Sequence, residues 1–363
     1  MDIQTNDDTN LPSSSSVSER YICNCYSCIF VKNILIKKLV EKWEPNIYNH
    51  IRVEHISQCS RNIVHQVFLS LRCGEEQKHE QFIVKLPKMG QDSAGFENEV
   101  RLYCMKEKFL IFRTLFPFCH LATYFSSNFP YPVVVLKDLT KYGYTQFRCK
   151  LDRTDLRICM EVLAKFHGTT FRLQNGNDYV SRALSYELSK NKEKRMNQRS
   201  KSVRNFLESI SIIGLDCDLY EKIKLKLQKI ERLETEIATT IIHGRFTRSK
   251  VFIKYADGGC YIQLIDFQSM TYDSPAIDFG RIFLTNLPDE YNVSSLEELF
   301  RSMLEAYLEK LKQEYPEVPS LLVEKDIIHN MILSYIYLNA QEIEAIENHK
   351  TILDMLNKIS SLD

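Results

Sequence analysis

The chain has 363 residues, and its 47 lysines and arginines balance its 47 aspartates and glutamates. Without net charge, the molecule has no overall field that would attract nucleic acid or an anionic membrane, so any site for a polyanion must be local. Apolar residues make up 44% of the sequence and charged residues 26%, which is typical of a globular protein with real hydrophobic cores.

The cysteines and the first residues indicate a compartment. The chain has 11 cysteines, an odd number, and several of them, such as Cys104 and Cys159, lie inside apolar periodic segments. This pattern favours reduced thiols over a disulfide framework. The polar start lacks an apolar run of signal-peptide length, and the apolar runs are too short to cross a bilayer. We therefore predict a cytoplasmic protein with no membrane or nucleic-acid partner; the oligomeric state stays open.

The first part of the chain changes from polar to helical to strand patterning. Residues 1–20 are rich in Ser, Asn and Asp, which predicts a disordered tail. Cys23, Cys25 and Cys28 then have the spacing of half a zinc site, but no second paired cluster follows, so chance spacing is the simpler interpretation and metal binding stays open. A helix is predicted from Ile29 to Trp43.

Strands and helices then alternate up to a clear change of pattern. Strands are predicted at 64–71, 82–86 and 133–136, with a helix at 96–109 between the last two. After Asp138 the pattern is mainly helical, apart from a second group of strands at 239–242, 251–255 and 260–267. We therefore predict an α+β fold with a β-rich N-terminal lobe at 21–138 and a larger, mainly helical lobe at 139–363.

This order of elements places residue types suited to phosphoryl transfer in strands, helices and loops that can face one site. A lysine late in a strand, such as Lys85, can hold nucleotide phosphates, and a glutamate of the following helix can orient it. A loop after a His-Gly pair can supply the residue that accepts a hydroxyl proton. An aspartate after a later strand, such as Asp266, can bind Mg²⁺ between phosphates. The sequence thus favours phosphoryl transfer over other reaction classes.

A series of short motifs follows the same order. They are Phe82-Ile83-Val84-Lys85, Phe96-x-x-Glu99-x-x-x-Tyr103, Leu136-x-Asp138-Leu139, Leu163-Ala164-Lys165-Phe166-His167, His243-Gly244, Ile265-Asp266-Phe267-Gln268 and Ser274-Pro275-Ala276-Ile277-Asp278. Together they resemble the motifs of the ecdysteroid kinase-like family, also called choline kinase-like or CHK, whose relatives include choline kinases and aminoglycoside phosphotransferases. The resemblance spans about residues 60–285 and implies a two-lobed protein-kinase-like fold.

The resemblance also implies roles for individual residues. Lys85 becomes the phosphate lysine and Glu99 its partner, with Glu97 as a rival for that place. The segment from Leu136 through Asp138 to Leu139 becomes the hinge where the backbone meets adenine, which makes Asp138 part of a nucleotide site. Asp266 becomes a metal ligand.

The remaining motif residues belong to or surround the catalytic loop. His243 is a candidate catalytic residue of that loop, although it can instead pack and hydrogen-bond within it. Asp278 is expected to brace that loop by hydrogen-bonding its backbone, and His167 is expected to be structural.

The catalytic loop departs from the family's pattern. The family has His-Gly-Asp followed by an asparagine five residues after the aspartate, whereas this chain has Arg245 and Lys250 at those two positions. An arginine cannot accept a proton, and loss of a positioned base costs on the order of 10²–10⁴ in rate. Lys250 brings a positive charge to a metal-ligand position, and Arg248 adds another nearby. The turn Cys59-Ser60-Arg61-Asn62 also lacks the glycines that let a backbone approach phosphates.

Two functions therefore remain open. The first is a catalytically impaired kinase-like protein, a pseudokinase, that keeps a cleft for ATP or a small molecule and depends little on Mg²⁺. The second is an active ATP-dependent kinase for a hydroxyl of an ecdysteroid-like or other small alcohol, because loose phosphoryl-transfer transition states rely more on positioning than on proton removal. In the first case we expect Asp266 to pair with Lys85, Lys250 or Arg245 instead of a metal.

Overall fold

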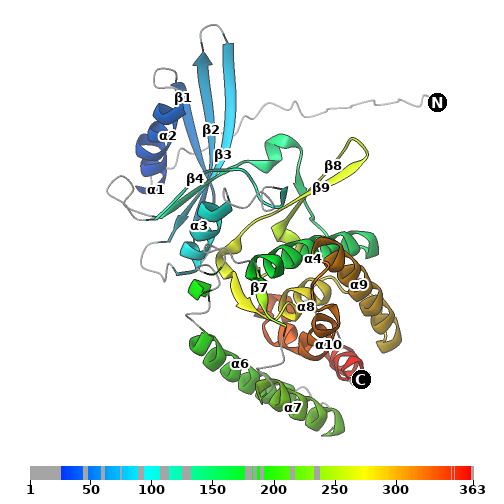
Figure 1. Ribbon diagram of the computed structural model, residues 1–363. Helices are drawn as coiled ribbons and strands as arrows, with labels where there is room; N and C mark the ends of the chain where they lie inside the picture. Colours follow the sequence, from blue (N-terminus) through cyan, green and yellow to red (C-terminus); the bar gives the residue numbers. More distant parts are fainter. Residues whose placement is uncertain are drawn as a thin grey trace, which may run out of the picture.

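Figure 1 shows the structure, a computed structural model. It describes residues 26–43, 48–58, 62–73, 76–88, 94–106, 114–124, 132–175, 182, 186–188, 192–212, 217–232, 238–344, 346 and 348–360. The predicted disordered tail at 1–20, the cysteines Cys23 and Cys25, and residues 59–61 of the glycine-free turn lie outside this part of the chain.

A five-stranded antiparallel sheet forms the upper part of the molecule in Figure 1, with its strands in the order β1-β2-β3-β5-β4. The strands are β1 (Tyr48–Gln58), β2 (Asn62–Cys73), β3 (Glu76–Pro87), β4 (Cys119–Thr123) and β5 (Val133–Lys137). The sequence predicts β2, β3 and β5, while β1 and β4 are not anticipated. The sheet ends at Lys137, and the division of the chain into lobes at residue 138 stays a prediction.

The two faces of the sheet are buried against different partners, which explains the run of apolar residues in β5. On one face, Phe82, Val84 and Val135 pack with the helical segment α1 (Tyr26–Phe30), η1 (Val31–Leu35) and α2 (Ile36–Trp43). On the other face, Val134 and Leu136 join the larger core of the molecule. We call the face that packs against the larger core the inner face. Because side chains alternate along a strand, Lys85, the neighbour of Val84, lies on this inner face.

Helix α3 (Ala94–Lys106) lies under the inner face of the sheet. Of the stripe that the sequence predicts, Phe96, Val100 and Tyr103 are buried, each at most 3% exposed, whereas Cys104 is exposed. The helix also lies against the short helix η5 (Phe267–Ser269), which comes from the other end of the chain. The larger core therefore connects the sheet with the helical part.

The helical part is built around two pairs of packed helices, α4 with α9 and α8 with α10. The helices after the sheet are η3 (Leu139–Tyr142), α4 (Arg153–Asn175), α6 (Lys192–Ile212), α7 (Cys217–Arg232), η4 (Arg248–Lys250), α8 (Ala276–Leu284), α9 (Val293–Glu314), α10 (Ser320–Ile336), α11 (Ala340–Glu344) and α12 (His349–Ile359). Gly280 permits the close approach of α8 to α10, because a Cβ there would lie 2.3 Å from the hydroxyl oxygen of Ser334.

Short strands flank the loops that contain the sequence motifs after residue 240. They are β6 (Thr145–Gln146), β7 (Thr240–Ile242), β8 (Val251–Ala256), β9 (Gly259–Leu264) and β10 (Thr271–Asp273). The predicted hairpin between β8 and β9 is confirmed: Asp257 and Gly258 both have positive φ, as a type I′ turn requires. The pairing of β10 with β7 fixes the ends of the two motif loops beside each other.

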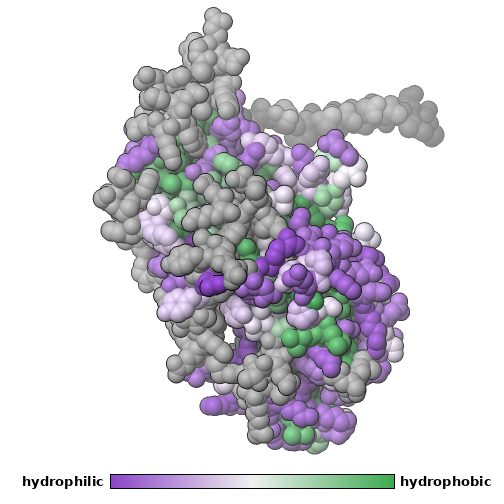
Figure 2. All heavy atoms as spheres, viewed as in Figure 1, coloured by the Kyte–Doolittle hydropathy of each residue, from purple (hydrophilic) through white to green (hydrophobic). Residues whose placement is uncertain are grey.

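The distribution of hydrophilic and hydrophobic side chains on the surface agrees with the buried cores described above. On the face shown in Figure 2, hydrophilic side chains cover most of the described helical part, and the hydrophobic ones show in smaller groups between them. Within the described residues, no helix is long and apolar enough to span a membrane.

Candidate functional site

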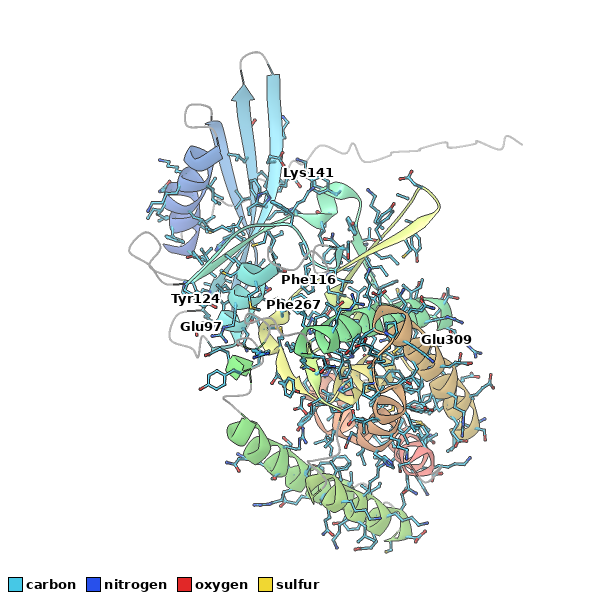
Figure 3. The ribbon with its side chains drawn as sticks, viewed as in Figure 1. Glu97, Phe116, Tyr124, Lys141, Phe267 and Glu309 are labelled. Carbon is cyan, nitrogen blue, oxygen red and sulfur yellow. The ribbon has the colours of Figure 1, made fainter. Side chains whose placement is uncertain are left out.

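The site begins with a buried ion pair between the sheet and α3. Lys85 of β3 is 6% exposed and Glu99 of α3 is fully buried. The Lys85 Nζ atom lies 2.7 Å from both carboxylate oxygens of Glu99. The structure thus brings together the two residues that the sequence predicts as partners. The rival, Glu97, is on the Tyr124 side of the helix in Figure 3, and its charge acts on that tyrosine.

Asp266, which lies 181 positions after Lys85 in the sequence, also contacts this ion pair. Its Oδ1 lies 3.4 Å from Lys85 Nζ, and its Oδ2 accepts a direct hydrogen bond from the ammonium group of Lys250. Burial alone would raise the pKa of Asp266, but the charges of Lys85 and Lys250 hold that pKa well below its usual range. The same carboxylates keep the pKa of Lys85 above its ordinary value despite burial. Lys85 and Asp266 are therefore charged near neutral pH, whereas burial raises the pKa of Glu99 although the charge of Lys85 opposes that rise.

The backbone at Asp266 adopts an uncommon conformation. Its φ is 71°, in the left-handed region that non-glycine residues rarely adopt. Such strain costs about 1–3 kcal/mol and persists where the surroundings enforce it, often at functional sites. Here the two ion pairs of the side chain and the packing of the next residue provide that enforcement.

The next two residues fix the loop in place. Phe267 is fully buried and its ring lies 4.6 Å from that of Phe116 and 5.8 Å from that of Phe166. Figure 3 shows Phe116 and Phe267 meeting where the sheet joins the helical part. Gln268 donates from Nε2 to Glu99 Oε2 at 3.3 Å. Asp266, Phe267 and Gln268 therefore connect the loop to different elements of the molecule.

The His-Gly loop is held by Asp278 of α8. One oxygen of its buried carboxylate accepts from the amide of His243 at 2.6 Å and the other from the amide of Gly244 at 2.9 Å. His167 of α4 lies 3.4 Å from Asp278 and 2.8 Å from the hydroxyl of Tyr307. The expected bracing by Asp278 and the structural place of His167 are both seen here.

His243 has no nitrogen free for proton transfer. Its Nε2 lies 2.9 Å from the carbonyl oxygen of Ile265, and its Nδ1 accepts from the amide of Arg245 at 3.4 Å. Burial lowers the pKa of His243, so the ring is neutral and donates from Nε2. This geometry makes His243 a positioning residue that links the two motif loops. It does not support the catalytic role that the sequence leaves open for His243.

Gly244 is required by space as well as by conformation. Its φ is 76°, and a Cβ at this position would lie 2.1 Å from the carbonyl oxygen of Ser269. No side chain fits there without moving the backbone. The two motif loops therefore touch through their backbones at this glycine.

The loop after Gly244 carries three cations, Arg245 and Lys250 at the two positions that depart from the family's pattern, and Arg248 between them. Arg245 is exposed, and within the described residues no carboxylate lies within salt-bridge distance of it. Arg248 donates to the carbonyl oxygen of Thr285 at 3.5 Å and to Asn286 Oδ1 at 3.3 Å, which orients it without neutralising its charge. Lys250 is already bound to Asp266. The loop therefore carries surplus positive charge.

These residues do not fit a Mg²⁺ ion. Magnesium is bound through carboxylates and retains several waters, and the one carboxylate at the expected place, Asp266, already binds two ammonium groups. Among the residues described, no group of three or more His, Cys, Asp or Glu side chains could hold a metal ion. Lys250 would oppose a divalent cation at its own position. The chemistry of the donor set therefore disagrees with a metal-dependent site.

The expected hinge is stabilised by side-chain contacts of its own. The buried carboxylate of Asp138 accepts from the amide and hydroxyl of Thr140 at 3.0 and 2.7 Å, and from Nε2 of Gln66 at 2.5 Å. Asp138 therefore caps η3 and joins it to β2. Its side chain has no oxygen directed to a ligand, so a nucleotide contact here would come from the backbone.

Some residues of the site leave no signal in the sequence. Phe116 precedes β4 and lies in the middle of the aromatic cluster, yet no motif marks it. Gln66 holds Asp138 across 72 positions of sequence. These contacts are long-range, and they emerge only when the sheet and the helical part are assembled.

The segment before α8 contacts a buried carboxyl group of α10 whose ionisation is opposed by its surroundings. Asp326 of α10 accepts from the hydroxyl of Ser274 at 2.6 Å and from Asn330 Nδ2 at 2.7 Å. Burial, with the charge of Asp273 nearby, raises the pKa of Asp326 to about 7. At neutral pH this carboxyl is therefore partly protonated inside the core.

Asp326 is expected to make stability fall as pH rises. The pKa of an unfolded aspartate is about 3.9, so between about pH 4 and pH 7 the folded state holds a proton that the unfolded state has lost. The variant Asp326→Asn should remove this dependence and exceed the unmodified chain in free energy of unfolding by roughly 2–3 kcal/mol at pH 8. Urea denaturation at pH 4.5 and pH 8 measures it; an equal difference at both values would contradict the assignment.

Comparison with known proteins agrees with this geometry. Residues 62–318, well over half of the chain, match the ecdysteroid kinase-like family. The chain belongs to the ecdysteroid kinase-like family. The match spans the Lys85–Glu99 pair, the His-Gly loop and Asp266. The comparison with curated proteins finds no match.

Solved structures confirm the two-lobed kinase-like fold of this family member. An ethanolamine kinase from Plasmodium vivax is similar with a TM-score of 0.50 and 12% identity, over 97% of this chain and 95% of that one. A GDP complex of an aminoglycoside 2'-phosphotransferase-IIIa mutant is similar with a TM-score of 0.50 and 12% identity, over 90% of this chain and 97% of that one. At this identity the likeness establishes the fold.

Proposed function

We propose that this member of the ecdysteroid kinase-like family is a pseudokinase that binds a nucleotide of the ATP type without needing Mg²⁺. The observation that carries the proposal is the double ion pair of Asp266 with Lys85 and Lys250. Two ammonium groups occupy the carboxylate that would bind metal ions in an active kinase, and Arg245 and Arg248 on the same loop add positive charge. The phosphates of a nucleotide would then meet ammonium groups directly.

Nucleotide binding is supported by the part of the site that remains intact. The pair of the strand lysine with the helix glutamate must be assembled in active kinases, and here it is, at 2.7 Å. A protein of the same fold is described as a GDP complex. Ile83 on the inner face of the sheet, two residues before Lys85, is only partly buried and offers an apolar side chain for a base.

Loss of catalysis is supported by the replaced base. Arg245 stands on the loop directly after Gly244, whose position is fixed by Asp278 and by contact with Ser269. A guanidinium has donors only, so it cannot take the proton of an attacking hydroxyl. His243 cannot substitute for it, since the backbone engages both of its ring nitrogens.

The second candidate is an active kinase for a small hydroxylated molecule. The assembled Lys85–Glu99 pair favours it, and the similar P. vivax protein is an ethanolamine kinase. Such an enzyme would have to transfer the phosphoryl group by positioning and charge alone. Release of phosphorylated product from ATP by the unmodified chain, tested on a panel of ethanolamine, choline and steroid alcohols, would establish this candidate and end the pseudokinase proposal.

Nucleotide binding is tested by calorimetric titration with ATP. The unmodified chain is compared with the double variant Lys85→Met with Glu99→Leu, which removes the pair and leaves apolar packing. We expect the variant to bind ATP at least about tenfold more weakly, because a charge-assisted hydrogen bond to phosphate is worth about 1.5–3 kcal/mol. Equal affinities in a folded variant would contradict the assigned place of the phosphates.

A further inference from the structure

A cavity of about 410 Å³ lies beside the loop that follows His243 and Gly244. It is bounded by the loop residues 245–250, by the end of α8 with the segment that follows it, and by residues around α11. Its size is within the usual range for small-molecule sites. No residue of this cavity takes part in the ion pair of Lys85 with Glu99.

The charges around the cavity leave a positive surplus. The two carboxylates among its described lining residues are already paired: Asp289 lies 2.6 Å from Lys150, and Glu342 lies 3.6 Å from Arg281 of α8. Lys250 is neutralised by Asp266. Arg245 and Arg248 remain, each without a carboxylate partner among the described residues.

The two arginines differ in how they are held, and both are open to a ligand. Arg248 is oriented by two oxygen acceptors from the end of α8 and the residues after it, which leaves its other donors free. Arg245 is exposed and its side chain makes no hydrogen bond with another described residue. Planar guanidinium groups bind phosphate through paired hydrogen bonds, and two of them match a doubly charged group.

The rest of the cavity wall combines polar side chains, those of Thr247, Ser249, Thr285, Asn339 and Gln341, with a mainly apolar part. The apolar part is formed by Leu284, Leu287, Pro288, Tyr291 and Ile346. A free inorganic ion would leave this surface without a partner. A ligand that fits both parts has an anionic end for the arginines and a small apolar body for the remainder.

We propose that this cavity binds the phosphomonoester of a small apolar alcohol, with Arg245 and Arg248 on the phosphate. The proposal deepens the pseudokinase function and rests on its assignment of Arg245 as a residue without a catalytic part. In an active relative the substrate hydroxyl would lie beside the base at this position. An arginine there instead favours the molecule after phosphorylation. The reaction class that supplies the ligand is therefore phosphorylation of an alcohol, carried out by another protein.

The test is a fluorescence titration of the full chain with 1-naphthyl phosphate, 1-naphthol, 1-naphthyl sulfate and inorganic phosphate. We expect 1-naphthyl phosphate to bind at least about tenfold more tightly than each of the other three compounds. 1-Naphthol lacks the phosphate, 1-naphthyl sulfate lacks the second negative charge, and inorganic phosphate lacks the apolar body. Equal binding of naphthol would exclude phosphate recognition. Equal binding of naphthyl sulfate or of inorganic phosphate would overturn the phosphomonoester as ligand.

Variants locate the binding in the cavity. Arg245→Gln and Arg248→Gln should each weaken 1-naphthyl phosphate at least about tenfold. Arg157→Gln is the matched control: it removes the same charge from an exposed arginine paired with Glu161 on α4 and should leave the affinity unchanged. Loss of affinity in the control as large as in the cavity variants, or none in the cavity variants, would overturn the proposal.

A further variant distinguishes ligand binding at the nucleotide site from ligand binding in the cavity. The double variant Lys85→Met with Glu99→Leu should lose ATP affinity and retain 1-naphthyl phosphate. If the chain binds no ATP but binds the phosphomonoester through both arginines, the cavity proposal stands and the nucleotide proposal fails. If the double variant loses both ligands while remaining folded, the phosphomonoester occupies the nucleotide site and the cavity proposal is overturned.

Discussion

Replacing Lys85 with methionine is expected to lower the free energy of unfolding by about 3–5 kcal/mol, because it leaves a buried carboxylate without its cation. Glu99 is fully buried and depends on Lys85 at 2.7 Å, with one further bond from Gln268. Asp266 keeps Lys250 and is less affected. Chemical denaturation of the unmodified chain and of the variant measures the difference.

Two controls distinguish the buried pair from a general effect of lost charge. The double variant Lys85→Met with Glu99→Leu should recover most of the stability, since apolar residues of similar volume often replace a buried pair at little cost. Lys222→Met removes a lysine from an exposed pair with Asp218 on α7 and should cost at most about 1 kcal/mol. If Lys85→Met cost no more than Lys222→Met, the pair would not stabilise the fold.

Restoring the two family residues of the loop should restore metal dependence. In the variant Arg245→Asp with Lys250→Asn, Asp266 loses the ammonium group of Lys250, and a carboxylate and an amide oxygen appear beside it. We expect Mg²⁺ to raise the ATP affinity of this variant at least about tenfold, equivalent to about 1.4 kcal/mol. A positioned base contributes on the order of 10²–10⁴ in rate, so phosphoryl transfer from ATP should also become detectable.

The single variants show which substitution matters for which property. Lys250→Asn alone frees Asp266 and should give metal dependence without turnover. Arg245→Asp alone leaves Lys250 on Asp266 and should give neither. If the unmodified chain already transfers phosphoryl groups as fast as the double variant, Arg245 and Lys250 do not block catalysis, and the pseudokinase proposal is wrong.

The parts of the site that could be predicted from sequence are those marked by local pattern. A lysine in a strand whose neighbours are apolar must face one side of the sheet, and a glutamate three residues after Phe96 lies on a helix face that can be aligned with it. The hairpin at Asp257-Gly258 follows from such a local pattern. The pairing of Lys85 with Glu99 is what the family resemblance implies, with Glu97 left as a rival that the structure places elsewhere. The replacement of acidic and amide groups by Arg245 and Lys250 is likewise visible in the sequence.

The parts that could not be predicted depend on contacts between distant segments. The strand β1 has polar residues on alternate positions and weak turn signals, and it pairs only because β2 offers an edge. Phe116 completes an aromatic cluster whose other members lie about 50 to 150 positions away. The cavity beside Arg245 is formed by three separate segments, so its volume and its charge surplus appear only in the folded chain.

One family position shows why residue type alone is an incomplete guide. Asp138 belongs to a motif of the nucleotide hinge, yet its carboxylate accepts three hydrogen bonds from Thr140 and Gln66. A buried carboxylate that is satisfied by protein donors gains nothing from a ligand. The motif therefore preserves the shape of the hinge, and any recognition of adenine belongs to the backbone.

The most direct test of the metal-independent cleft is the affinity of the unmodified chain for ATP, measured with excess Mg²⁺ and again with a chelator. Asp266 is held by Lys85 and Lys250, so its carboxylate is not free to bind the metal. We predict that the two affinities differ by less than about threefold, which is about 0.7 kcal/mol. Binding that appears only with Mg²⁺, accompanied by phosphoryl transfer, would contradict the account and identify the chain as an active kinase.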